Sequence, residues 1–286
     1  MHGGAYRILR GLEREDGALG MYGWLDSARF AISLIFLSAA SIHDIKSREV
    51  PNYIWATFAP IGLALTLISL ALNGWNQTII LAWIVTAAVT IGLSMALFYL
   101  GLFGGADAKA LMCLAASMPT QPNQAVIKPL MEAYTPIPPP ISTFNNAVLS
   151  ASLLTIAISI RNLIDLARNG RRIFDGLEDE KLMTKAFAFM TGYRVHSRKL
   201  RSGKHHYIIL EEFSKDENGR IKRRLKILKR LSIGGEGEGE EKSILNDYEG
   251  EVWVTMGLPF IVFITFGFAA SILIGDLIFL LINALL

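Results

Sequence analysis

Long apolar stretches alternate with short polar ones along most of the chain. A run of about 20 apolar residues lets a helix cross the hydrocarbon core of a membrane, which is about 30 Å thick. Six windows reach or approach that length, and they lie at 25–43, 54–72, 78–100, 107–119, 144–164 and 253–282. The pattern predicts an all-α polytopic membrane protein with about six transmembrane helices.

Two of these windows do not fit a simple crossing. The window 107–119 is short and contains Lys109, so it either crosses the membrane or forms a buried helix that stops at Pro119. The window 253–282 is too long for one straight crossing and is interrupted at Gly275 and Asp276. We expect the last span to continue as a tilted or broken helix, or to end in a tail at the membrane interface.

A polar segment of different composition separates the fifth and sixth windows. Basic residues outnumber acidic ones between Asp165 and Gly250. Within 177–190, apolar residues follow one another at helical spacing, which predicts an amphipathic helix. They are Leu182, Met183, Ala186, Phe187 and Met190. We expect this segment to be a small α+β soluble insert before the last helix.

The sequence of the rest of the insert predicts a β-hairpin and a linker. Segments 206–213 and 220–228 flank a turn at 215–219, as in a β-hairpin. The glycine- and glutamate-rich run 234–241 has nothing to bury, so we expect a flexible linker there.

These patterns divide the chain into four parts. We expect a polar N-terminal leader at 1–24, a membrane domain of five helices at 25–164, the soluble insert at 165–250 and a last transmembrane helix at 251–286. The leader lacks the short apolar core and small-residue cleavage site of a signal peptide. Met21 directly precedes the first span, which leaves open whether translation starts at Met1 or Met21.

Composition supports this membrane class and excludes others. Hydrophobic residues make up 52% of the chain and charged residues 19%, with a net charge of +3, whereas an average soluble domain is about 25% charged. The high apolar content excludes a disordered or collagen-like chain. The single cysteine, Cys113, excludes an internal disulfide and a cysteine zinc site.

Basic residues in the short loops predict the orientation. The loop after the first span carries Lys46 and Arg48, and the insert carries many more, whereas 73–77 has none. By the positive-inside rule, the first loop and the insert face the cytoplasm.

Two acidic residues lie where membrane proteins rarely place them without a function. Asp44 ends the first window and Asp107 begins the fourth. Because two windows separate their loops, both acids face the same side of the membrane. Each has a structural alternative, since Asp107 is also a typical helix N-cap and Asp44 a solvated helix end.

Two carboxyl groups held on one face are what an aspartic hydrolase requires. The ionised group deprotonates a water that attacks the scissile carbonyl, and the protonated group hydrogen-bonds the carbonyl oxygen. Nearby like charges allow the pair to share one proton. The alternative is a non-catalytic membrane platform or a transporter in which Asp44 and Asp107 form an ion or proton site.

The motifs around both acids are similar to those of a known family. Asp44 is followed by Lys46, Arg48, Val50, Pro51 and Asn52, and about sixty residues later the chain reads Gly104-Gly105-Ala106-Asp107-Ala108-Lys109. This pairing resembles the type IV prepilin peptidases, membrane aspartic proteases with a Gly-x-Gly-Asp motif, and among them the archaeal preflagellin peptidases. The segment 253–261 resembles the start of the last helix in the archaeal members, and the resemblance covers most of 25–280.

The resemblance implies an activity and a substrate. It makes Asp44 and Asp107 the catalytic pair of an aspartic endopeptidase that needs neither a metal nor another cofactor. The enzyme would remove the short basic leader from archaellin or type IV pilin-like precursors at the cytoplasmic face of an archaeal cell membrane, before filament assembly. Ala106 departs from the Gly-x-Gly-Asp pattern. Bacterial relatives also methylate the new N-terminus through paired Cys-x-x-Cys motifs, and a chain with one cysteine is not expected to do so.

Further residues are candidates for shaping the site or binding substrate. Gly104 and Gly105 let backbone approach the acid, and Lys109 either favours the ionised state of the pair or extends to the lipid headgroups. Glu178, Asp179 and Glu180 either bind the basic leader or form a solvated first helical turn. The basic residues of the predicted hairpin favour membrane lipids as a partner over nucleic acid.

Overall fold

A computed structural model describes residues 23–72, 74–122, 127, 130, 136–201, 207–215, 221–225, 248–256 and 259–286. The described chain forms two compact units, one of residues up to Ala151 together with Pro259–Leu286, and one of Ser152–Leu258. Most of the expected leader and the expected linker at 234–241 lie outside the described residues.

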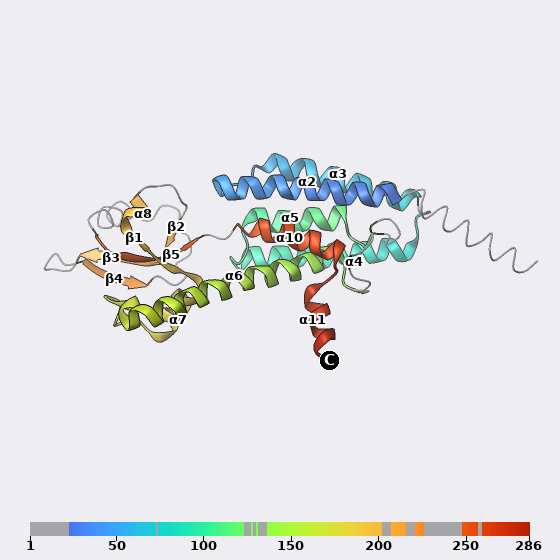
Figure 1. Ribbon diagram of the computed structural model, residues 1–286. Coiled ribbons are helices and arrows are strands. Elements are labelled where there is room, and N and C mark those ends of the chain that lie inside the picture. Colours follow the sequence, from blue (N-terminus) through green and yellow to red (C-terminus); the bar gives the residue numbers. More distant parts are fainter. Residues whose placement is uncertain are drawn as a thin grey trace, which may run out of the picture. The chain divides into compact units, whose positions relative to one another are not determined.

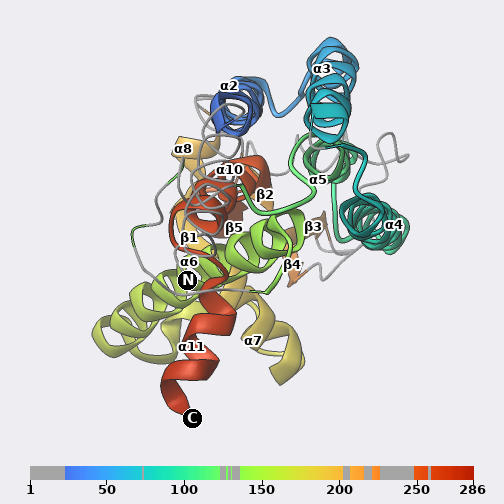
Figure 2. The same cartoon turned by 90° about the vertical axis from the view of Figure 1, so that its right-hand side faces the viewer.

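Unit 1 is a helical bundle (Figures 1 and 2). Its helices are α2 (Gly23–Ser47), α3 (Asn52–Leu72), α4 (Gln77–Tyr99), α5 (Gly105–Ser117), the first part of α6 (Pro139–Asn169), α10 (Phe260–Leu273) and α11 (Leu277–Leu285). They follow the apolar windows because an uninterrupted apolar sequence satisfies its backbone hydrogen bonds internally only as a helix.

Four helices are long and apolar enough to cross a membrane, which makes the chain a multi-pass membrane protein. They are α2, α3, α4 and α6, and the bent pair α10 and α11 gives a fifth if it counts as one span. The expected number of six is therefore not confirmed. The window 107–119 forms α5, whose 13 residues extend only about 20 Å at 1.5 Å per residue.

The last apolar window is a broken helix, as its Gly275-Asp276 interruption predicts. The axes of α10 and α11 differ by 59°, and Gly275 takes a φ of 111° that suits glycine. Asp276 is fully buried and caps α11, because its side chain accepts hydrogen bonds from the Phe279 N–H at 2.9 Å and from Asn145 at 2.7 Å. The role of Asp276 in the described chain is structural.

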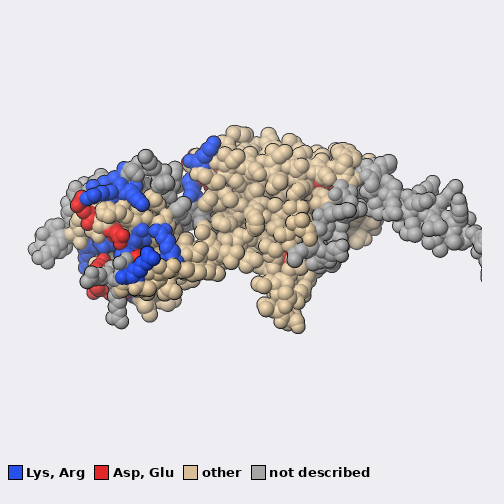
Figure 3. Space-filling view, viewed as in Figure 1, with Lys and Arg blue, Asp and Glu red and all other residues tan. Residues whose placement is uncertain are grey.

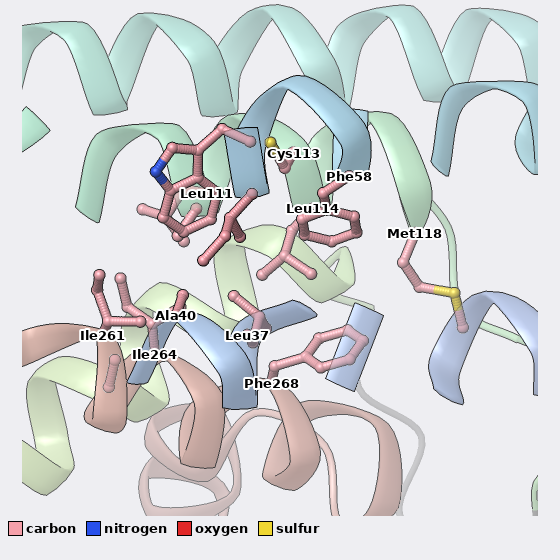
Figure 4. Packing of buried hydrophobic residues seen from close by; sticks show 14 of the residues in the cluster. Leu37, Ala40, Phe58, Leu111, Cys113, Leu114, Met118, Ile261, Ile264 and Phe268 are labelled. Atoms are coloured by element: carbon pink, nitrogen blue, oxygen red, sulfur yellow. The ribbon is translucent and has the colours of Figure 1, made fainter. Parts of the chain in front are cut away.

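The short helix α5 lies at the centre of unit 1, in contact with α2, α3, α4 and α10. Its small and aliphatic side chains let these neighbours approach closely, and Leu111 and Leu114 pack with Phe58, Leu37 and Phe268 in one cluster (Figure 4). All five residues are fully buried. A core of this kind orients α5 although the helix is too short to span.

Side chains from three spans cap the C-terminal end of α5. The last carbonyl groups of a helix have no partner within it. Arg29 donates to the Ser117 carbonyl at 2.8 Å, Thr66 to the Ala116 carbonyl at 2.8 Å, and Trp83 to the Ala115 carbonyl at 3.3 Å. The end of α5 can therefore lie inside the bundle without a polar penalty.

The surface of the helices is apolar. Large hydrophobic side chains such as Leu81, Ile84 and Val89 are more than half exposed, and Figure 3 shows the helical surface almost free of charged residues, which gather on unit 2. An apolar exterior of this extent suits contact with lipid.

Unit 2 is an α+β unit, as expected for the insert. After the second part of α6 come η1 (Gly170–Phe174), α7 (Leu182–Thr191), β1 (Tyr193–His196), α8 (Ser197–Arg201), β2 (Tyr207–Ile209), β3 (Glu211–Lys215), β4 (Ile221–Leu225) and β5 (Glu251–Met256). The antiparallel pair β3 and β4 confirms the hairpin, and α7 confirms the expected helix, which begins at Leu182 and ends at Thr191. Residues 207–209 pair with β5 instead of extending the hairpin.

One expectation about the last helix is wrong. Residues 251–256 form β5, which lies between β1 and β2 in an antiparallel sheet, and the helix α10 begins only at Phe260. The β-branched Val252, Val254 and Thr255 favour a strand, and Pro259 suits the residue before a helix. Val252, Trp253 and Val254 are at most 1% exposed, and β5 is the central strand of its three-stranded sheet.

Candidate active site

Asp44 lies near the C-terminal end of α2, where the chain turns sharply toward α3. The helix ends at Ser47, and Arg48 follows with a φ of 59°, the left-handed conformation that often ends helices. The Arg48 N–H donates to the Asp44 carbonyl at 3.2 Å. Arg48 also interacts electrostatically with the Asp44 carboxyl group, so the turn itself supplies a positive neighbour.

The first turn of α10 also contacts Asp44. The backbone N–H of Ile261 lies close enough to the Asp44 carboxyl group to affect its electrostatic environment. Since α10 begins at Phe260, this N–H is one of those that have no partner inside the helix. The positive end of the α10 dipole thus faces a group that carries negative charge when ionised.

Asp107 is the third residue of α5, and its carboxyl group folds back onto the start of its own helix. Its Oδ2 accepts a hydrogen bond from the Gly104 N–H at 3.0 Å. A Cβ atom at Gly104 would lie 3.1 Å from this oxygen, closer than side chains normally approach. A Cβ at Gly105 would meet only Phe98, at an ordinary 3.7 Å. Gly104 therefore provides room for the acid, and Gly105 does not contact it.

The two carboxyl groups lie near each other. Asp44 contributes directly to the electrostatic environment of Asp107, although they come from different helices and are 63 positions apart in the chain, at 44 and 107. Both are partly exposed, so water reaches them. Two neighbouring carboxyl groups that lie near backbone N–H groups and remain open to water can hold one proton between them.

Lys109 links the two sequence motifs. Its ammonium group donates to the Asn52 Oδ1 at 2.7 Å, joining α5 to the first residue of α3. The contact with Asn52 involves neither acid, so both roles considered for Lys109 stay predictions. Arg48, Asn52 and the N–H of Ile261 were missed as site residues. The first two belong to the motif that follows Asp44, whereas nothing in the sequence indicates the backbone contact of Ile261.

Glu178, Asp179 and Glu180 lie in unit 2, where they line an open pocket of about 760 Å³ with Lys222 and Arg224. Glu178 accepts a hydrogen bond from the Gly176 N–H at 2.8 Å, which lowers its pKa. Glu180 accepts from the Leu225 N–H at 3.3 Å. Two of the three acids thus stabilise local structure, and binding of a basic leader by this segment stays a prediction.

The described residues contain no group of three or more His, Cys, Asp or Glu side chains that is arranged to hold a metal ion. What the site does offer is a pair of acids, one cationic neighbour for Asp44 and backbone donors, which is a set suited to proton transfer.

Comparisons with known proteins cover both units. Residues 31–160 match the model of the type IV leader peptidase family, and residues 184–277 match a model described as archaeal peptidase A24 C-terminus type II. Asp44 and Asp107 lie within the first match.

Three archaeal proteins named preflagellin peptidase are similar in sequence. The chain is 38% identical to that of Methanococcus voltae over 138 residues, which is 47% of this chain and 58% of that protein. It is 28% identical to that of Methanocaldococcus jannaschii over 257 residues, covering 86% of this chain and 94% of that protein. It is 25% identical to that of Methanococcus maripaludis over 250 residues, covering 86% and 95%.

Proposed function

Because this chain belongs to the type IV leader peptidase family, we propose that it is an aspartic endopeptidase whose catalytic pair is Asp44 and Asp107. Membership accounts for a protease in a multi-pass membrane chain. The aspartic mechanism, the residues and the membrane face belong to the proposal.

The observation that carries the proposal is the approach of the two carboxyl groups. They interact electrostatically across α2 and α5. Asp107 accepts a hydrogen bond from the Gly104 N–H, and the Ile261 N–H lies near Asp44. Backbone donors hold a carboxyl group in one orientation without occupying all of its oxygen lone pairs. The remaining lone pairs are free to bind a water molecule and a substrate carbonyl.

The chemistry follows from one proton shared by two acids. The ionised carboxylate removes a proton from a bound water as its oxygen bonds to the scissile carbonyl carbon, while the protonated carboxyl stabilises the carbonyl oxygen with a hydrogen bond. In the second step the carbon–nitrogen bond breaks, and the amine takes up the proton that the first carboxylate had received. The products are a new carboxyl end and a new N-terminus.

We propose the leader of archaellin or pilin-like precursors as the substrate. The relatives named preflagellin peptidase support this class. Lys46 and Arg48, close to Asp44 in the chain, favour a site at the cytoplasmic face by the positive-inside rule. There the enzyme would cut between a basic leader and the apolar helix that enters the filament.

The surrounding residues receive supporting roles in the same proposal. Gly104 leaves space for Asp107, Gly105 begins α5, and Lys109 holds α3 against α5 through Asn52. Glu178, Asp179 and Glu180 would attract the basic leader through charge from unit 2.

The test is cleavage of an archaellin precursor by membranes that contain wild type, Asp44→Asn or Asp107→Asn, read as a shortened product on a gel. An amide keeps the shape of the carboxyl group but cannot exchange its proton, so both variants are expected to leave the precursor intact. Glu49→Gln is the matched control, because this acid lies in the same turn and its side chain is exposed. It is expected to cleave like wild type.

The outcomes separate the two candidate functions. Cleavage by either aspartate variant, present at the wild-type level, would show that the pair is wrongly assigned. Wild-type membranes that cleave neither archaellin nor pilin precursors would instead favour the platform or transporter, in which the two acids bind an ion or proton.

A further inference from the structure

The helix α7 of unit 2 exposes an apolar face in addition to the apolar residues that it packs into the core of its unit. Its buried positions include Thr184 and Ala188, whereas one exposed face is entirely apolar. That face consists of Leu182 (81% exposed), Met183 (80%), Met190 (52%), Phe187 (36%) and the exposed Ala186. A soluble unit rarely leaves a continuous apolar face of this kind in water.

The contacts of α7 place it beside a membrane span. Asn162 of α6 is 4% exposed and donates to the carbonyls of Phe189 at 2.7 Å and Gly192 at 2.6 Å. These carbonyls end α7, so a buried side chain of α6 caps the helix. All these residues belong to unit 2, together with the second part of α6.

The sequence of α6 indicates where the Asn162 cap lies relative to the hydrocarbon core of the membrane. No charged residue occurs from Pro139 to Ile160, a length of about 33 Å at the helical rise, which matches the hydrocarbon core. Arg161 is the first charged residue of α6, and its guanidinium lies 4.4 Å from the centre of the Tyr193 ring. Arginine and tyrosine are typical of the membrane–water interface.

Exposed apolar side chains of α6 continue past this level. Ile160 is 53% exposed, Leu163 58% and Ile164 50%. The end of the span and α7 therefore both present apolar residues around the Asn162 cap.

We propose that α7 is an interfacial helix whose apolar face inserts into the bilayer beside the end of α6. The apolar face contacts lipid at the boundary between headgroups and acyl chains, where helices with one apolar face bind. Lys181 directly precedes the helix and Lys185 lies within it, but Glu178, Asp179 and Glu180 offset them, so local charge gives no preference for anionic lipid. The insertion anchors unit 2 to the membrane in addition to its chain connections through α6 and α10, independently of whether the chain cleaves precursors.

Site-specific spin labels on the full chain in phosphatidylcholine vesicles test the proposal. The only native cysteine, Cys113, is buried, so Cys113→Ala removes unwanted labelling. Met183→Cys then reports on the apolar face of α7, and Ser214→Cys, at an exposed position of β3, is the matched control. Oxygen enriches in lipid and a neutral nickel chelate in water, and their collision rates with each label are compared.

We expect an oxygen-to-nickel collision ratio several-fold higher at position 183 than at position 214, and the same ratio in vesicles of phosphatidylglycerol. Equal ratios at the two positions would overturn the proposal. A high ratio at 183 that disappears when the protein is diluted among more vesicles would assign the face to a second copy. A high ratio at 183 that appears only after a precursor is added would assign the apolar face to substrate binding. Either of these two results would also overturn lipid insertion.

Discussion

The ammonium group of Lys109 on α5 lies 2.7 Å from the Oδ1 of Asn52 on α3, and the hydrogen bond between them joins the two motifs that carry the candidate acids. Asn52 is the first residue of α3 and lies eight positions after Asp44. Lys109 lies two positions after Asp107. The contact thus ties the chain after one acid to the helix that carries the other, and it is the one side-chain link of this kind recorded for the described residues of the two motifs.

Removing this link is expected to lower catalysis without unfolding the protein. Both residues are exposed, so replacing them should leave the fold intact. Asn52→Ala and Lys109→Met should each reduce kcat/KM about tenfold, which is the low end for the loss of a hydrogen bond to a charged group. The double variant should be little worse than either single one, because both remove the same contact. The measurement is a double-mutant cycle on precursor cleavage, and additive losses would contradict the role of the pair.

The adjacent glycines at the start of α5 are expected to respond differently to alanine. A Cβ at Gly104 would press on the Asp107 Oδ2 at 3.1 Å, and the φ of −70° and ψ of 158° there suit alanine. Gly104→Ala should therefore displace the carboxyl group by a few tenths of an ångström and lower kcat about tenfold or more. Gly105→Ala should stay near the wild-type rate, since its Cβ meets only Phe98 at 3.7 Å. Equal rates for both variants would remove Gly104 from the site.

Two further glycines, Gly62 of α3 and Gly92 of α4, test how closely α3 packs on α5. A Cβ at Gly62 would lie 2.5 Å from the Ser117 Cβ and 3.1 Å from its Cα, so Gly62→Ala forces the helices apart at a cost of about 1–3 kcal/mol. Gly92 of α4 has nothing within 4 Å, and Gly92→Ala should stabilise its helix by about 0.5–1 kcal/mol. Thermal unfolding in one detergent compares them, and a Gly62→Ala variant as stable as wild type would contradict the close approach.

Hydropathy predicted the helices of unit 1 well but not the depth of α5. The apolar windows give the approximate bounds of α2, α3, α4 and α6, because lipid-exposed backbone must be helical. Whether a short apolar run crosses or ends inside the bundle depends on partners for its last carbonyls. Those partners, Arg29, Thr66 and Trp83, are distant in sequence from Ser117, and no local pattern reveals them.

The strand β5 was missed for a related reason. Glu251–Met256 is mostly apolar and adjoins a helix, so hydropathy merged it with the last span. Its strand conformation depends on pairing with β1 and β2, more than forty positions earlier in the chain. The left-handed Arg48 was equally hidden, because that conformation is typical of glycine. The assignment of Asp44 and Asp107 as a pair came from spacing and resemblance and stays a prediction until the variants are assayed.

The buried ion pair of unit 2 gives a last prediction, about stability. Arg223 binds both carboxylate oxygens of Glu211, at 2.7 and 2.8 Å, and the Glu211 side chain is 0% exposed. Arg223→Met leaves this carboxylate with the Trp253 N–H at 2.6 Å as its remaining recorded donor, which should destabilise unit 2 by about 3–5 kcal/mol. Arg224→Met, at the next and exposed position of β4, should change stability by less than about 0.5 kcal/mol. Hydrogen exchange of the β3, β4 and β5 amides in the full chain measures both, with faster exchange expected only for Arg223→Met. Unchanged exchange in that variant would mean that the Arg223–Glu211 pair does not stabilise unit 2.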